Sequence, residues 1–356
     1  MDSSMNLEER IRHFSRQYAA VKGEIIKDIV GQEEAVDGTL IAMIAGGNVL
    51  LEGVPGTGKT RLVRSVARTL DLMFSRIQFT PDLMPADVTG ANIIEKDEKG
   101  NNKQRFVGGP IFSNIVLADE INRATPKTQS ALLEAMQEHR VTAGGRTWEL
   151  MEPFFVLATQ NPIEQDGTYM LPEAQMDRFM FKLFMTFPAE EELCRIVRLT
   201  QDTQEERSER IMNGEELLAM RETAKEIPVI DEVVAYAARL VASTHPELDG
   251  ASETVKKELR FGASPRAVQA LIYGARIQAL IEGRYNVSYD DIDALACPAL
   301  RHRVKLTYDA LMRGRTPDQV ITALIGELRA ERGSKRTKAA KTEGAEIPDR
   351  RLFRRS

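Results

Sequence analysis

The sequence reads Gly53-Val-Pro-Gly-Thr-Gly-Lys-Thr60, which matches the phosphate-loop pattern G-x-x-x-x-G-K-[ST] in full. The apolar run Asn48–Glu52 before it is typical of a strand, and apolar residues recur at helical spacing between Thr60 and Leu70 after it. Glycines in such a loop let backbone N–H groups and the start of the next helix surround phosphate groups. Strand, loop and helix in this order predict a site for ATP or GTP.

The residue types within this loop predict individual contacts. Lys59 is expected to reach the β and γ phosphates, and Thr60 is expected to bind Mg²⁺ through its hydroxyl. The residues expected to contact the nucleotide are Gly53, Val54, Pro55, Gly56, Thr57, Gly58, Lys59, Thr60 and Arg61.

Apolar runs of strand type alternate with helical stretches through the first half of the chain. This alternation is typical of a parallel sheet covered by helices on both faces. We therefore predict an α/β domain over residues 1–189, with helices at its start and a parallel five-stranded sheet between helices. The expected strands are Val49–Glu52, Phe74–Phe79, Ile115–Ala118, Phe154–Ala158 and Lys182–Phe187.

Two further segments have the pattern of hairpins inserted into this domain. One lies between Gly90 and Phe112 and has a polar tip. The other spans Val141–Leu150, with Gly144-Gly145 at the turn.

After Pro188 the strand pattern stops, and residues up to about Ala330 are nearly all of helical type, with an expected break near Pro298. This predicts an all-α domain over residues 190–331. From Arg332 to Ser356, nine Lys/Arg against three Asp/Glu give a charge of +6, which leaves −11 on the rest of a chain whose net charge is −5. We interpret residues 332–356 as a basic, disordered tail, with an electrostatic tether to an acidic partner as the alternative.

Composition excludes several classes of protein. With 356 residues, 42% hydrophobic and 28% charged, the chain is long enough for about two globular domains. No apolar run approaches about 18 residues, so no membrane span is expected. The start Met1-Asp-Ser-Ser4 lacks a signal pattern, so a cytoplasmic location is expected. The acidic body argues against a primary nucleic-acid-binding surface, and the two distant cysteines predict no disulfide framework.

A second nucleotide signal is the stretch Asn114-Ile-Val-Leu-Ala-Asp-Glu120, an apolar strand that ends in two carboxylates. In a doubly wound sheet these side chains would lie next to the phosphate loop. Asp119 is expected to hold Mg²⁺, and Glu120 to polarise the attacking water.

Three more side chains are candidates for the site. Asn161 ends the next strand-like run and could orient the water or touch the γ phosphate. Arg178 lies just before the last expected strand. Arg266 follows Ser264-Pro265, which has the pattern of a helix N-cap and first helical residue. A positive charge in the first turn is unfavourable for the helix dipole, so this placement makes sense if the guanidinium faces an anion.

Together these motifs resemble those of AAA+ ATPases, and most closely those of the MoxR family. The resemblance spans roughly Ile29 to Ala330. Met170 and Met176 stand where proline and leucine are expected, and the basic tail beyond about Arg332 has no counterpart. Besides the phosphate loop it rests on Ala118-Asp-Glu-Ile-Asn-Arg-Ala124, Gln137-Glu-His-Arg-Val-Thr142, Ala158-Thr-Gln-Asn-Pro162, Leu171-Pro-Glu-Ala-Gln175, Asp177-Arg-Phe179 and Gly262-Ala-Ser-Pro-Arg-Ala267.

The resemblance implies an ATPase domain followed by a helical lid, assembled as a homo-oligomeric ring, expected to be a hexamer. It implies that Asn161 is the residue called sensor 1, that Arg178 is an arginine finger acting across a subunit interface, and that Arg266 is sensor 2. Ile29, Val30, Gly31 and Gln32 are similar to the AAA+ segment that lies against the adenine.

The resemblance also implies a chaperone-like function: ATP hydrolysis that matures or activates a partner, through metal-cofactor insertion or complex assembly. MoxR relatives are associated with proteins bearing von Willebrand factor A domains, so such a partner is expected. The alternatives are a magnesium-chelatase-like ATPase subunit and a nucleic-acid motor, although the mixed charge of Glu95-Lys-Asp-Glu-Lys99 suits a motor poorly. A scaffold that does not hydrolyse is a further alternative, against which Glu120 and Arg178 argue.

Overall fold

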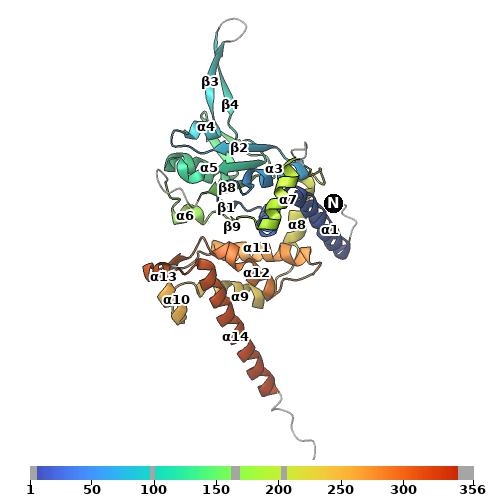
Figure 1. The fold of residues 1–356 in the computed structure, drawn as a ribbon, viewed down its shortest axis with the longest axis vertical. Helices are drawn as coiled ribbons and strands as arrows, with labels where there is room; N and C mark the ends of the chain where they lie inside the picture. Colours follow the sequence, from blue (N-terminus) through green and yellow to red (C-terminus); the bar gives the residue numbers. More distant parts are fainter. Residues whose placement is uncertain (1–5, 97–100, 162–168, 202–206, 344–356) are drawn as a thin grey trace, which may run out of the picture.

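The computed structural model of the chain describes residues 6–96, 101–161, 169–201 and 207–343. A parallel sheet with helices forms the upper body in Figure 1, and a group of helices lies below it. The predicted fold, an α/β AAA+ domain with a helical lid, is therefore confirmed. Across the described residues, no helix is long and apolar enough to cross a membrane.

The sheet has five parallel strands in the order β2-β5-β8-β1-β9. Each expected run forms a strand whose ends differ from the prediction by one or two residues. The strands are β1 (Val49–Gly53), β2 (Phe74–Gln78), β5 (Ile115–Asp119), β8 (Phe155–Gln160) and β9 (Phe181–Met185). The helices of this unit are α1 (Leu7–Asp28), α2 (Glu33–Ala45), α3 (Lys59–Thr69), α4 (Pro85–Thr89), α5 (Pro126–Glu138) and α6 (Glu173–Met176), with a 3-10 turn, η1 (Ile121–Arg123).

Alternate strand residues pack into different buried clusters. Val49 and Leu51 belong to the cluster that contains side chains of α1, α2 and α3, whereas Leu50 belongs to the cluster that contains those of α5. This follows from the period of two in a strand, which sends neighbouring side chains to opposite faces. The first cluster continues into the lid, because Ile277 and Leu295 also belong to it. The lid therefore completes the core on one side of the sheet.

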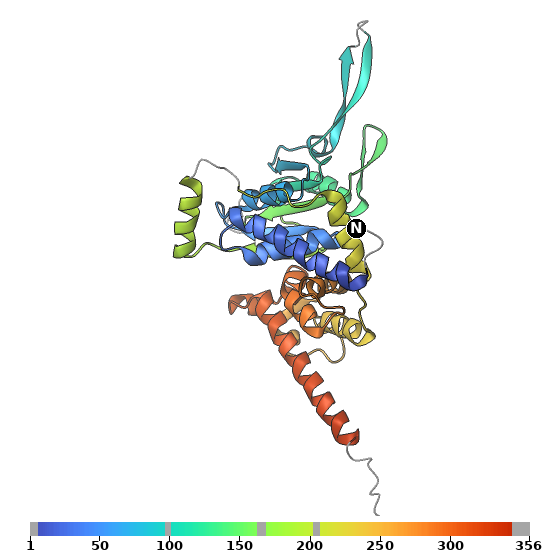
Figure 2. The same ribbon diagram turned by 90° about the vertical axis from the view of Figure 1, so that its right-hand side faces the viewer.

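Two hairpins project from the α/β unit (Figures 1 and 2), at the places the sequence predicts. They are β3 (Gly90–Lys96) with β4 (Asn102–Gly108), and β6 (Arg140–Ala143) with β7 (Arg146–Glu149). Gly144 and Gly145 have φ of 62° and 77°, because a two-residue hairpin turn of this kind needs positive φ at both positions.

The two hairpins contact each other. The rings of Phe106 and Trp148 are stacked, with centroids 4.7 Å apart and planes 14° apart. Asn92 also donates from Nδ2 to the carbonyl of Gly144 at 3.2 Å. Segments inserted at different points of the sequence are thus held together as one projecting unit.

After β9 the described residues are mainly helical. The elements are α7 (Glu190–Gln201), α8 (Gly214–Lys225), α9 (Asp231–Ala242), α10 (Glu253–Glu258), α11 (Arg266–Ile281), α12 (Tyr289–Leu300), α13 (Tyr308–Met312) and α14 (Pro317–Glu343), with a short antiparallel pair, β10 (Leu259–Phe261) and β11 (Lys305–Leu306).

The structure differs from the sequence expectation at three places in this region. Strands of two and three residues, such as β10 and β11, are too short to show a period of two in the sequence. Pro298 lies inside the last turns of α12 rather than at a break. The expected tail begins at residue 332, whereas α14 extends to Glu343, because Lys and Ala favour helix; residues 344–356 lie outside the described part.

Trp148 is the only tryptophan of the chain, so its fluorescence reports on the contact between the hairpins. We expect Phe106→Ala to shift the emission of Trp148 to longer wavelength, because the ring would lose its stacked neighbour and meet water. Emission spectra of the native chain and of the variant check this, with Phe261→Ala, an exposed phenylalanine of the lid, as the control. An unshifted spectrum in Phe106→Ala would contradict the contact.

Candidate functional site

The carboxyl ends of the parallel strands bring most of the predicted site residues to one edge of the sheet. The phosphate loop leaves β1 after Gly53, Asp119 ends β5, and Asn161 directly follows β8. These three strands are neighbours in the sheet, because β8 lies between β5 and β1. The loop, the two carboxylates and Asn161 therefore lie side by side, as the sequence predicts.

The loop has the conformation that its glycines allow. Gly56 and Gly58 have φ of 86° and 93°, a region that side-chain-bearing residues rarely adopt. Lys59 begins α3 and donates from Nζ to the carbonyls of Gly53 and Val54, the latter at 3.1 Å. Burial lowers the pKa of Lys59, while the negative charges of Asp119 and Glu120 oppose this shift. The ammonium is thus held inside the loop, where a phosphate would compete with the two carbonyls.

Arg61, which the sequence predicts to contact the nucleotide, faces away from the phosphate loop. The Arg61 guanidinium lies 3.8 Å from the buried carboxylate of Asp28, at the end of α1. In this structure Arg61 therefore faces α1.

Asp119 is oriented by two side chains that sequence reasoning missed. Its Oδ2 accepts from Arg76 Nε and Nη2 at 3.0 and 2.6 Å, and its Oδ1 accepts from Thr159 Oγ1 at 2.6 Å. Arg76 comes from β2, and it reaches Asp119 because β2 pairs with β5 so that Gln78 lies opposite Asp119. No local signal marks Arg76, since the contact depends on strand order.

The residues present fit a magnesium ion. Asp119 and Thr60 supply carboxylate and hydroxyl oxygens, which are the ligand types that Mg²⁺ prefers. Across the described residues there is no group of three or more His, Cys, Asp or Glu side chains that could hold a metal. A site with so few protein ligands suits Mg²⁺, which is commonly held by one or two protein oxygens together with phosphates and water.

Glu120 has a constrained position. Its φ is 56°, which is uncommon for a residue other than glycine, although Asp71 and His139 also have positive φ. Its carboxylate accepts from Gln78 Nε2 and from Arg123 Nη1, both at 3.0 Å. Its backbone N–H donates to Thr159 Oγ1 at 2.9 Å, so Thr159 orients both adjacent acids.

The segment that resembles an adenine-binding strip also lies at this edge. Ile29 and Val30 are buried, and Gln32 donates from Nε2 to the carbonyl of Thr186 at 2.9 Å, just after β9. Gly31 has φ of 71°, and a Cβ there would lie 2.3 Å from the carboxyl carbon of Glu192 on α7. The segment is thus packed between the end of β9 and α7.

Arg178 lies at the opposite edge of the sheet. In the pairing of β1 with β9, Val49 is opposite Phe181 and Gly53 is opposite Met185. Arg178 precedes Phe181, so a full strand of about 13 Å separates it from the phosphate loop of the same chain. Its Nη1 donates to the carbonyl of Leu133 on α5 at 2.9 Å.

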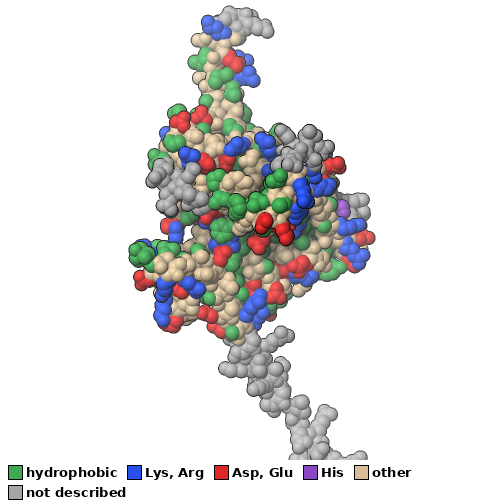
Figure 3. All heavy atoms as spheres, in the orientation of Figure 1, with side chains coloured by type: hydrophobic (Ala, Val, Ile, Leu, Met, Phe, Trp, Pro, Cys, Tyr) green, Lys and Arg blue, Asp and Glu red, His purple; other side chains and the backbone are tan. Residues whose placement is uncertain are grey.

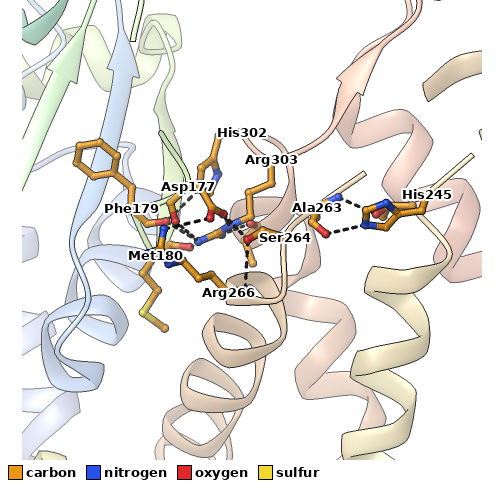
Figure 4. A network of polar contacts seen from close by, with 11 residues as sticks. Asp177, Phe179, Met180, His245, Ala263, Ser264, Arg266, His302 and Arg303 are labelled. Atoms are coloured by element: carbon orange, nitrogen blue, oxygen red, sulfur yellow. Dashed lines mark hydrogen bonds and ion pairs between the residues drawn. The ribbon is translucent and has the colours of Figure 1, made fainter. Parts of the chain in front are cut away.

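Arg266 lies at Asp177, the residue before Arg178, and so at the same edge of the sheet as Arg178. The predicted cap is off by one residue: α11 begins at Arg266 with Pro265 as its N-cap, although Ser264 Oγ still accepts from the backbone N–H of Arg266 at 3.2 Å. Arg266 Nη1 lies 3.4 Å from Oδ2 of Asp177, the residue before Arg178 (Figure 4). The fold therefore separates the two arginines from the chain's own phosphate loop.

Asp177 is the centre of a polar network between sheet and lid, which sequence reasoning missed (Figure 4). Its Oδ1 accepts from Ser264 Oγ at 2.7 Å and from Arg303 Nε at 2.8 Å. Arg303 also donates to the carbonyls of Phe179 and Met180 at 2.7 and 3.0 Å. Burial lowers the pKa of Arg303, and Asp177 opposes that shift.

His302 is buried and contacts the same segment of the sheet as Arg303. Burial lowers its pKa well below the ordinary value, so the ring is neutral. Its Nε2 lies 3.0 Å from the carbonyl of Phe179, so this nitrogen carries the proton and donates it.

Comparisons with known proteins agree with this geometry. The model of the ATPase family associated with various cellular activities (AAA) matches residues 48–181, and that of the AAA lid domain matches residues 251–324. Chaperone MoxR1 of Mycobacterium tuberculosis is 44% identical over 85% of this chain and 79% of its own length. Protein MoxR of Methylorubrum extorquens is 31% identical over 81% of this chain and 87% of its own. A crystal structure of a presumed ATPase from Cytophaga hutchinsonii has a TM-score of 0.82 and 40% identity, covering 89% of this chain and 96% of that one.

We expect Asp177→Asn to loosen the lid. The substitution keeps the shape but leaves the buried Arg303 guanidinium without its counter-charge, which should lower the free energy of unfolding by about 2 to 3 kcal/mol. Urea unfolding of the variant and of Asp249→Asn, an exposed carboxylate of the lid, would measure this. If the two variants had the same free energy of unfolding, Asp177 would not be the residue that holds the lid on the sheet.

Proposed function

The chain belongs to the MoxR family of AAA+ ATPases, and we propose that it hydrolyses ATP at sites shared between adjacent copies of the chain in a ring. The observation that carries this proposal is the placement of charged groups at opposite edges of one sheet. Lys59, Asp119 and Glu120 lie at the carboxyl edge, and Arg178 and Arg266 at the amino edge. Only a neighbouring copy can bring the two sets together.

The carboxyl edge would bind ATP and Mg²⁺. Backbone N–H groups of residues 56–60, at the start of α3, would surround the phosphates, and Lys59 would exchange its two loop carbonyls for phosphate oxygens. Bound Mg²⁺ would be held by Thr60 and Asp119 and would neutralise phosphate charge. Ile29, Val30, Gly31 and Gln32 would lie against the base.

Glu120 would act on the attacking water. Gln78 and Arg123 hold its carboxylate at a defined position, so that the oxygen turned away from them can take a proton from an attacking water. Asn161, buried at the end of β8, would orient that water or touch the γ phosphate. The energetic contribution comes mainly from positioning and electrostatic stabilisation, as is general for phosphoryl transfer.

The amino edge of the next subunit would supply the remaining positive charge. Arg178 would act as an arginine finger, and Arg266 as the second arginine of the lid. Arg266 is held at Asp177, the residue before Arg178, and Arg178 is held at the carbonyl of Leu133 on α5, so a neighbour would present both arginines from one edge of its sheet. A guanidinium can match the oxygens of a phosphoryl group in a fixed planar geometry.

We propose that ring assembly, as a hexamer in the cytoplasm, converts this hydrolysis into remodelling of a partner protein. A related protein is named a chaperone, which supports a chaperone-like role. The partner would be a protein with a von Willebrand factor A domain, and the process metal-cofactor insertion or complex assembly. A magnesium-chelatase-like ATPase subunit is the second candidate, since it would use the same site.

Variants of two residues should separate binding from hydrolysis. We expect Glu120→Gln to keep ATP affinity while the hydrolysis rate falls at least about 100-fold, because the carboxylate acts on water. Lys59→Ala should instead weaken ATP binding, since it removes the charge that faces the phosphates. Isothermal titration with ATP and a phosphate-release assay measure the two effects. If Glu120→Gln hydrolysed ATP at the rate of the unsubstituted chain, Glu120 would not be the general base.

Mixed rings test the shared site. Arg178→Ala and Glu120→Gln should each be nearly inactive, with a loss on the order of 10³ for the arginine. When the two variants are mixed, some interfaces pair an intact Glu120 with an intact Arg178, and part of the activity should return. Labelled chains must first demonstrate subunit exchange. With exchange demonstrated, a mixture as inactive as its components would overturn the shared site.

A further inference from the structure

Large apolar side chains are exposed at two separate places of the molecule. One group, the lid-end patch, consists of Phe261 on β10 with Tyr308, Leu311 and Met312 on α13, and Tyr308 is 74% exposed. The other group, the α7 patch, consists of Phe187, Leu193 and Val197, and Phe187 is 72% exposed. Figure 3 shows hydrophobic side chains over α13 at the left and around α7 at the centre.

Each patch adjoins one half of the proposed composite site. Phe261 lines a cavity of about 250 Å³ together with Asp177 and Ser264, so the lid-end patch adjoins Asp177, the residue that holds Arg266 and precedes Arg178. The α7 patch begins at Phe187, directly after Thr186, whose carbonyl accepts the hydrogen bond of Gln32. The two patches therefore flank the amino-edge arginines and the nucleotide edge respectively.

The charges around the patches are complementary. The first turn of α7 carries three consecutive acids, Glu190–Glu192. The lid-end patch is bordered by Arg260, whose guanidinium carbon lies 5.2 Å from the ring centroid of Phe261, and by Arg313. Arg313 Nη2 is 4.0 Å from Glu258, a carboxylate that Arg315 binds more closely at 2.9 Å. The exposed charge of Arg313 is thus weakly engaged within its own chain.

We propose that the lid-end patch of one subunit packs against the α7 patch of the next subunit in the ring. A ring of identical chains needs head-to-tail contacts, in which two different surfaces of the chain meet. Aromatic and Met side chains surrounded by charged groups are typical of such an interface. The inference rests on the proposed shared site, and it names the surfaces that would bring that site together.

This contact would join the lid of one subunit to the helix beside the nucleotide of its neighbour. Glu192 of α7 packs against Gly31 in the expected adenine strip. The lid in turn holds Arg266 at Asp177. A change in the nucleotide site of one subunit would thereby move the lid, and with it the arginines, of the next.

The exposed Cys194 on α7 allows a direct test. One chain would keep Cys194 and carry Cys297→Ser. A second, tagged chain would carry Cys194→Ser, Cys297→Ser and Leu311→Cys. Oxidation of the mixed ring with ATP should join the two chains by a disulfide, visible as a doubled mass on a non-reducing gel.

The matched control replaces Leu311→Cys by Tyr285→Cys in the second chain. Tyr285 is also exposed on the lid, but it follows α11, whose 16 residues place it about 24 Å from Arg266. We expect at least about tenfold less cross-linked product from this control. If the Leu311→Cys and Tyr285→Cys chains gave equal amounts of cross-linked product, or if Leu311→Cys gave none, the proposed contact would be overturned.

A charge exchange tests the same contact without cysteines. Arg313→Glu should weaken ring assembly, measured by sedimentation velocity at low salt, and adding Glu191→Arg to the same chain should restore it. Failure of the second substitution to restore assembly would count against the contact.

The outcomes also separate this inference from the proposed function. Recovered activity in the mixed Glu120→Gln and Arg178→Ala rings without the Leu311 cross-link would overturn the patch contact and leave the shared site standing. The cross-link without recovered activity would uphold the contact and overturn the shared catalytic site.

Discussion

The carboxylate of Asp177 is the point at which the sheet and the lid are joined. It accepts hydrogen bonds from Ser264 and Arg303 and faces the guanidinium of Arg266, so the start of α11 and the end of α12 both depend on it. Arg303 is buried, and a buried guanidinium is tolerated only with a counter-charge and with acceptors for its N–H groups. Asp177 supplies the charge, and the carbonyls of Phe179 and Met180 supply acceptors. The position of the lid on the sheet follows from this requirement.

The polarity of the parallel sheet then decides where each reactive group lies. All five strands point the same way, so every residue that follows a strand lies at one edge and every residue that precedes a strand lies at the other. Lys59, Asp119 and Asn161 follow strands, whereas Arg178 precedes β9. Arg266 also lies at the edge where the strands begin, because it binds Asp177. This separation of the two groups within one chain is the physical basis for proposing catalysis between chains.

The two edges of the sheet are bordered by different kinds of surface, as the proposed head-to-tail ring would require. The nucleotide edge is bordered by α7, with acids in its first turn and apolar residues beyond them. The arginine edge is bordered by the end of the lid, with aromatic and Met side chains among basic ones. The hairpin of β3 and β4 lies at the top of the α/β unit in Figure 1, away from both α7 and the lid.

The sequence by itself determined the features that depend on neighbouring residues. The glycines of the phosphate loop, the alternation of strands with helices and the Gly144-Gly145 turn are local patterns, so the fold class and the nucleotide edge could be predicted. Only the tertiary structure decided the contacts between distant segments. Arg76 reaches Asp119 through strand order, and Asp177 meets Arg303 across 126 positions of sequence. Such contacts leave no periodic signal, because they arise from packing after the elements have formed. For the same reason the sequence could name Arg178 and Arg266 as site residues, but only the fold placed both at the edge away from their own phosphate loop.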